Sequence, residues 1–225
     1  MSSTLRSIEE RGESGALVRG YLHEAAGEVV ASAVLTHGAG GNAQGALLVA
    51  LAEELARRNV AVLRYDLPFR QLRQHGPPSP SSAGRDQQGL RDAAGVLRKL
   101  AGGKVMIGGQ SYGGRQASML AASEPGACDG LLLMSYPLHA PGKTQLRDAH
   151  FSQITVPALF VQGDKDPFGT VEEMTSSIRL LKVPSEHMVV KGVGHDLGWS
   201  GRKRVADLPK EIANRFMEFF KVQHG

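Results

Sequence analysis

The residues best suited to chemistry are a serine and its flanking glycines in the pentapeptide G-Q-S-Y-G at 109–113. A β-type run at 104–107 precedes it and a helix-type run at 115–122 follows it. A serine with glycine at −2 and +2 between a strand and a helix is the pattern of a nucleophile elbow. Such a turn strains the backbone of Ser111 and brings residues 109 and 113 close together, so we expect that neither tolerates a Cβ atom. A glycine-rich loop with a capping serine has the same pattern, so other residues must decide between a catalytic and a purely structural serine.

A serine hydroxyl is a weak nucleophile until a base takes its proton. Of the eight histidines, only His195 lies in a short glycine-flanked loop directly after the last predicted strand, 186–190. Asp164 and Asp166 follow the predicted strand 156–162, and either carboxylate would hold the imidazole. We prefer Asp166, three residues after a glycine, and assign Asp164 to the turn. An idle loop histidine and a simple Asp-Pro turn explain these residues singly, but not their order Ser…Asp…His, which is the order of α/β-hydrolases.

An oxyanion formed at the serine needs backbone donors. The glycine-rich loop 36–42 follows another predicted strand, and glycines let its backbone approach a substrate. We assign one donor to the N–H of Ala39, with Gly40 as the alternative, and the other to the N–H of Tyr112 at the start of the helix. His37 is interpreted as a structural residue of this loop.

The same loop approximates a dinucleotide-binding fingerprint, with Gly38, Gly40 and Ala43 followed by Asp66 at the end of the next strand. That alternative leaves the serine motif, the acid and the histidine without a role, so we favour the hydrolytic interpretation. The sequence has no G-K-[ST] phosphate loop and no H-E-x-x-H zinc motif. We therefore predict no cofactor and no metal.

A long Pro-, Ser- and Gly-rich segment at 67–84 is predicted as a functional loop that overhangs the site. Arg70 or Arg73 in this segment would bind an acidic group of a substrate. An arginine tied to a neighbouring carboxylate such as Asp66 fits the sequence equally well. Arg115, one turn into the helix after the serine, has the same two interpretations.

Alternating strands and helices predict an α/β fold with a mostly parallel central sheet and helices on both faces. In such sheets the site lies at the carboxyl ends of the strands. We expect one domain over residues 1–225, with residues 1–15 as a loose arm or an edge strand. The remaining predicted strands are 16–22, 29–36, 60–65 and 131–136, and the main predicted helices are 46–57, 90–100, 171–181 and 209–221.

Composition excludes several classes of protein. The net charge of +4 is mild and the basic residues are scattered, which argues against nucleic-acid binding. The start of the chain has no apolar signal, and no apolar run approaches the roughly 18 residues of a membrane span. The single cysteine, Cys128, rules out a disulfide framework. We expect a cytoplasmic protein with a small-molecule substrate; the sequence does not predict its oligomeric state.

With these motifs assembled, the chain resembles the α/β-hydrolase superfamily over nearly its whole length. More closely it is similar to a small bacterial branch that resembles testis-expressed protein 30 and the hydrolase-like domain of a nonspecific-lethal complex subunit, mainly in the stretches 65–70 and 162–169. Dienelactone hydrolases share the compact size, but their nucleophile is cysteine where this chain has Ser111, so their substrate is not carried over.

The resemblance implies an α/β-hydrolase fold, a triad and hydrolase activity, but it supplies no substrate. Our leading hypothesis is a serine hydrolase that acts on a small ester, thioester or amide through an acyl-enzyme. The resemblance also implies an alternative, a non-catalytic interaction module on the hydrolase fold. The segment 137–154 is too short for a full lid domain, so we expect an open, shallow site.

Overall fold

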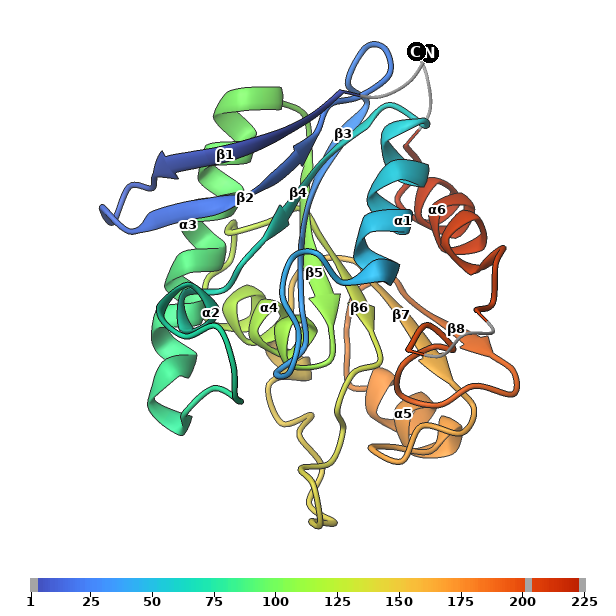
Figure 1. Ribbon diagram of the computed structural model, residues 1–225. Coiled ribbons are helices and arrows are strands. Elements are labelled where there is room, and N and C mark those ends of the chain that lie inside the picture. The colour runs from blue at the N-terminus through green and yellow to red at the C-terminus, as the bar shows by residue number, and fades with distance from the viewer. Residues whose placement is uncertain (1–3, 201–203, 223–225) are drawn as a thin grey trace.

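The computed structural model describes residues 4–200 and 204–222, and its strands form one sheet (Figure 1). The eight strands are β1 (Leu5–Arg11), β2 (Leu17–His23), β3 (Ala31–Thr36), β4 (Val60–Tyr65), β5 (Val105–Gln110), β6 (Gly130–Met134), β7 (Ala158–Gly163) and β8 (Ser185–Val190). Their order across the sheet is β1-β2-β4-β3-β5-β6-β7-β8. The six strands from β4 to β8 are parallel, whereas β1 and β2 are antiparallel to their neighbours.

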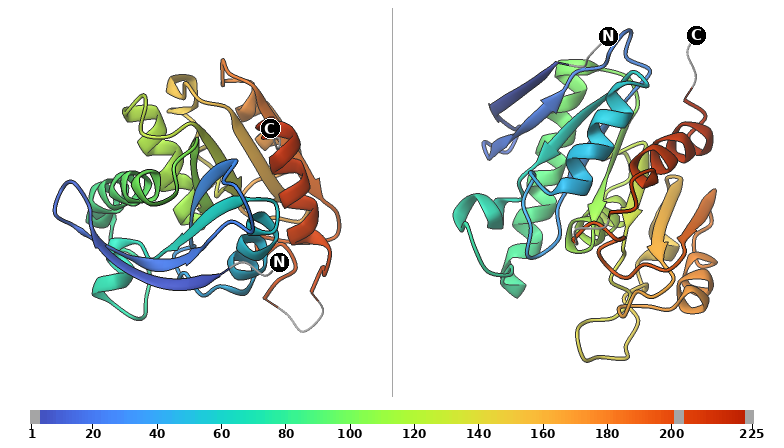
Figure 2. Two further views of the ribbon diagram at one scale, coloured as in Figure 1. Left: turned by 90° about the horizontal axis from the view of Figure 1, so that it is seen from above. Right: turned by 45° about the vertical axis from the view of Figure 1, so that its right-hand side comes forward.

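Helices cover both faces of the sheet, as Figure 2 shows from two further directions. One face packs against α1 (Ala46–Ala56) and α6 (Leu208–Phe219). The other packs against α2 (Pro68–Leu72), α3 (Ala83–Ala101), α4 (Tyr112–Ser123) and α5 (Val171–Ile178). Because both faces are covered, β3, β4, β6 and β7 are buried along their whole length, which explains why most of their residues are apolar. The predicted fold class is therefore confirmed.

The amino-terminal segment and the segment 67–84 differ in part from expectation. Of the two alternatives for residues 1–15, the edge strand is correct, since β1 pairs with β2; residues 1–3 lie outside the described part of the chain. The segment 67–84 is not irregular throughout. Pro68 begins α2, where its fixed φ and missing N–H suit a first helical position, and α3 begins at Ala83. Only Leu67 and residues 73–79 of this segment lie outside a helix.

The connection between β6 and β7 contains no lid domain. It holds one short 3₁₀ helix (Phe151–Gln153) and an isolated bridge between His139 and Leu146, and in Figure 1 it projects as a long yellow loop at the bottom of the molecule. Within residues 4–200 and 204–222, no helix combines the length and the apolar character needed to cross a membrane.

Candidate active site

Ser111 is the single residue between β5 and α4, and its backbone is strained, with φ of 52° and ψ of −116°. A Cβ at Gly109 would overlap the carbonyl oxygen of Thr36, and the φ of Gly109 is 146°. A Cβ at Gly113 would lie 2.5 Å from Thr36 Cγ2 and 2.7 Å from the His37 carbonyl oxygen. The glycines are thus required by the neighbouring strand β3 and the loop after it. The prediction that neither position tolerates a Cβ atom is confirmed, and the nearest clashing atoms belong to Thr36 and His37.

His195 lies in the loop after β8 and contacts Ser111 directly. Its Nε2 is 2.8 Å from Ser111 Oγ, and its Nδ1 is 2.8 Å and 3.0 Å from the two carboxylate oxygens of Asp166. With Nδ1–H donating to Asp166, Nε2 is left to accept from the Ser111 hydroxyl. The Asp166 side chain is fully buried, whereas a quarter of the His195 side chain is exposed. Gly163 makes this possible, since a Cβ there would overlap the Val193 carbonyl of the passing loop.

The two aspartates after β7 have different partners. Asp166 also accepts the Phe168 N–H at 2.9 Å, and the Phe168 ring packs edge-on against His195 at 4.5 Å between centroids. Asp164 instead accepts the Gly192 N–H at 2.7 Å, which ties the loop after β7 to the loop after β8. The carboxylate that contacts the imidazole is therefore Asp166, and Asp164 lies in the turn.

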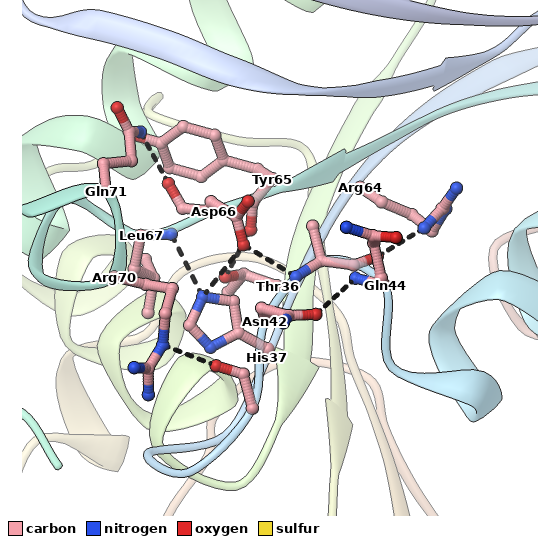
Figure 3. Close-up of polar contacts among 12 residues, drawn as sticks. Thr36, His37, Asn42, Gln44, Arg64, Tyr65, Asp66, Leu67, Arg70 and Gln71 are labelled. Carbon is pink, nitrogen blue, oxygen red and sulfur yellow. Dashed lines mark hydrogen bonds and ion pairs between the residues drawn. The ribbon is translucent and has the colours of Figure 1, made fainter. Parts of the chain in front are cut away.

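Arg70 contacts the backbone of the loop after β3, and Figure 3 shows its Nε donating to a carbonyl oxygen of that loop. Only 6% of its surface is exposed. Its guanidinium donates to the carbonyls of Gly41 (2.7 Å), Ala39 (2.9 Å), Gly76 (3.0 Å) and Arg73 (3.1 Å). These carbonyls are the partners in place of the substrate or the Asp66 carboxylate expected from the sequence. Arg73 is exposed and donates to the Pro77 carbonyl, so it does not line the cavity either.

Two more side chains fix the same loop, as Figure 3 also shows. The carboxylate of Asp66 accepts the Ala43 N–H at 2.7 Å. His37 Nδ1 lies 2.9 Å from the Gly38 carbonyl, and its Nε2 accepts the Leu67 N–H at 3.2 Å. These partners require a neutral ring protonated at Nδ1, and burial lowers the pKa of His37 in agreement. His37 is thus a structural residue of the loop.

The side chain of Tyr112 is fixed by a separate contact, with Asp86 of α3. Its hydroxyl donates to the buried carboxylate of Asp86 at 2.7 Å, and the same carboxylate accepts the Phe69 N–H at 3.0 Å. Burial raises the pKa of Asp86, although these hydrogen bonds oppose the shift. Among the described residues, neither the Tyr112 N–H nor the Ala39 N–H has an acceptor. Both residues line one cavity with Ser111.

This cavity has a volume of about 480 Å³. Two proline-rich segments line it, one with Pro77, Pro78 and Pro80 and the other with Pro137 and Pro141, and the open, shallow site stays a prediction. The segment 67–84 overhangs the site as predicted, through residues 77–80 and 83.

Arg115 lines the cavity, as the sequence had suggested, whereas Gly40 does not. Sequence reasoning missed three further lining residues, Gln116, Arg147 and Phe168. Phe168 follows the acid closely and could have been found; nothing in the sequence around Arg147 marks it. No group of three His, Cys, Asp or Glu side chains in the described part of the chain is placed to hold a metal ion.

Comparison with known proteins agrees with this fold. Residues 29–221 match the model of the family described as alpha/beta hydrolase domain, so the chain belongs to that family. Its fold resembles dienelactone hydrolase from Anabaena variabilis, with a TM-score of 0.76, 19% identity and coverage of 97% of this chain and 99% of that one. An alpha-beta serine hydrolase homologue from Coxiella burnetii has a TM-score of 0.74 at 17% identity, covering 93% and 96%. Est1E from Butyrivibrio proteoclasticus has a TM-score of 0.73 at 18% identity, and the match covers 96% of this chain and 99% of that one. At these identities the likeness concerns the fold, and the protein is a hydrolase by family.

Proposed function

We propose that the protein is a serine hydrolase that cleaves a small ester, thioester or amide through an acyl-enzyme. The observation that carries this proposal is the continuous chain of contacts from Ser111 Oγ through the His195 ring to Asp166, each link at 2.8 Å. Ser111, where this chain of contacts begins, has a strained backbone and lines a cavity large enough for a small molecule.

In the proposed reaction, His195 Nε2 takes the Ser111 proton as Oγ attacks the scissile carbonyl carbon. The negative oxygen that forms accepts hydrogen bonds from the N–H groups of Ala39 and Tyr112. Asp166 holds the Nδ1–H tautomer and stabilises the imidazolium. His195 then donates its proton to the leaving group, which departs as the acyl-enzyme forms. A water deprotonated by the same Nε2 releases the acid and restores Ser111.

Two features favour this proposal over its alternatives. Cys128 is buried, and burial raises the pKa of its thiol to about 12, so the thiol stays protonated at neutral pH and does not compete as a nucleophile. An interaction module has no need of the aligned hydroxyl, imidazole and carboxylate, or of the arginine that fixes the loop at Ala39. No contact within the described residues specifically favours that second function.

The first experiment is labelling with a fluorophosphonate probe, followed by intact-mass analysis. Attack by Ser111 Oγ on phosphorus expels fluoride, so wild type should gain one probe mass less hydrogen fluoride. Ser111→Ala and His195→Ala should gain none, while Asp164→Asn, which leaves Ser111 and its base untouched, serves as the labelled control. An adduct that persists in Ser111→Ala, or its absence from folded wild type, would refute an activated Ser111.

Two finer assignments belong with this proposal. We place the chain in the branch that resembles testis-expressed protein 30 and the nonspecific-lethal complex subunit. In support, its two marker stretches include Arg70, which fixes the loop at Ala39, and Asp166. We also propose a cytoplasmic location, for which the lone, buried Cys128 is the support.

A further inference from the structure

The cavity beside Ser111 contains two arginine side chains without a counter-charge. Arg115 comes from α4 and Arg147 from the connection between β6 and β7. Neither guanidinium makes a hydrogen bond or an ion pair with any of the residues that the structure describes. The Nε of Arg115 is buried and unpartnered. Because burial keeps water from the Arg115 Nε–H, leaving this donor unpaired is costly unless a ligand supplies an acceptor.

A third donor lies in the same cavity. Gln116 has no exposed surface, and its Nε2 has no partner among the described residues. Its orientation is fixed because Gln87 donates to its Oε1 at 2.9 Å. None of the described residues that line the cavity has a carboxylate side chain. The side chains of Arg115, Arg147 and Gln116 are therefore hydrogen-bond donors in the cavity that lack acceptors among the described residues.

Neighbouring groups do not supply the missing charge. Asp148, next along the chain from Arg147, accepts the Ser177 hydroxyl at 2.6 Å. Burial and the charge of Arg115 together lower the pKa of Arg147. His150 is held neutral, with burial and the charge of Arg115 lowering its pKa to about 4. The two arginines thus repel each other, and a bound anion would remove that repulsion.

We propose that the substrate carries an anionic group, a carboxylate or a phosphate, that Arg115 and Arg147 bind together with the Gln116 amide. This inference rests on the proposed serine hydrolase function and names its substrate class. Arg115 lies in the first turn of α4, four residues after Ser111, so the two Cα atoms are about one helical turn, roughly 6 Å along the axis, apart. Planar forked donors suit carboxylate and phosphate oxygens in pairs.

The test compares isosteric pairs that differ only in charge. On the acyl side the pair is the mono-para-nitrophenyl ester of adipic acid and the corresponding ester of its terminal amide. On the leaving-group side it is para-acetoxybenzoate and para-acetoxybenzamide. Wild type should have a kcat/KM for the anionic member of at least one pair that is about tenfold or more higher, as a hydrogen-bonded charge implies. Equal values in both pairs would overturn the inference.

Arg115→Gln and Arg147→Gln should each reduce that ratio by about tenfold or more. Lys143→Gln is the matched control, because it removes one exposed positive charge from the same loop as Arg147 without touching the cavity. A drop in the ratio for Lys143→Gln equal to that for Arg147→Gln would reduce the effect to long-range attraction and contradict a built site. Arg147→Gln keeps the test valid if the substitution at the more buried Arg115 prevents folding.

Calorimetric titration with benzoate and with phenyl phosphate decides the inference separately from turnover. Binding to wild type that is lost in Arg147→Gln supports the anion site even if no fluorophosphonate adduct forms, in which case only the proposed chemistry fails. Adduct formation without binding or preference for either anion would leave the hydrolase proposal standing and refute this one. The tighter of the two ligands identifies the anion as carboxylate or phosphate.

Discussion

Replacing Gly113 with alanine tests whether the elbow depends on its contact with β3. The new Cβ would lie 2.5 Å from Thr36 Cγ2 and 2.7 Å from the His37 carbonyl oxygen, where ordinary contact begins near 3.4 Å. The Thr36 methyl cannot rotate away cheaply, since its hydroxyl donates to the Tyr65 carbonyl at 2.9 Å. The start of α4 and the loop after β3 must therefore separate by most of an ångström. Overpacking of this kind costs about 1–3 kcal/mol of unfolding free energy.

The same displacement moves Ser111 and the Tyr112 N–H away from Ala39. A misplacement near 1 Å reduces turnover by about 10²-fold, so we expect a loss of that order in kcat. Urea unfolding and steady-state ester hydrolysis measure the two effects. Gly95→Ala is the control, because that position in α3 has no heavy atom within 4 Å and alanine should stabilise the helix by about 0.5–1 kcal/mol. Wild-type activity and stability in Gly113→Ala would show that the steric reasoning is wrong.

Three further outcomes follow from other contacts. Asp166→Asn should reduce kcat by about 10³–10⁴-fold and Asp164→Asn by less than about tenfold, as measured on one ester, because only Asp166 contacts the imidazole. Arg70→Met should reduce kcat by about 10-fold or more with little change in KM, since the loop at Ala39 loses its fixed position; an unchanged kcat would contradict this. The pKa of His23 is lowered to about 4 by burial and the charge of Arg64, so the unfolded chain binds more protons between pH 6.5 and 4. Unfolding free energy should therefore fall by up to roughly 3 kcal/mol as pH drops through that window, and less in His23→Gln; identical pH profiles would refute the assignment.

Much of the fold could be predicted because its signals are local. The buried strands are short apolar runs, and α3 repeats its apolar residues at helical spacing, with Leu90, Ala93, Ala94 and Leu97 buried. The positions of Ser111, Asp166 and His195 follow from the same rule, since each comes directly after a strand of a parallel sheet. A parallel sheet gathers those strand ends at one edge without further information.

The arginines could not be assigned in this way. The position of Arg70 in a proline-rich segment suggested a substrate contact, yet α2 turns it onto four backbone carbonyls. Arg147 lies in a long connection with almost no regular structure, so no periodicity predicts where it points. The partner of a long, flexible side chain depends on which distant segments the fold brings near it.

The arginines near the site differ in their partners: Arg70 is paired with backbone carbonyls, whereas Arg115 and Arg147 in the cavity are not. Where donors serve the catalytic geometry, the chain itself supplies their acceptors: Arg70 has carbonyls and the Tyr112 hydroxyl has the Asp86 carboxylate. Those groups are fixed before a substrate arrives, which is the condition for stabilising charge that appears only during the reaction. Arg115 and Arg147 have no such acceptors among the described residues, although they lie in the same cavity. A buried donor without a partner lowers stability, so its presence beside the proposed nucleophile Ser111 supports our inference that the missing acceptor belongs to a substrate.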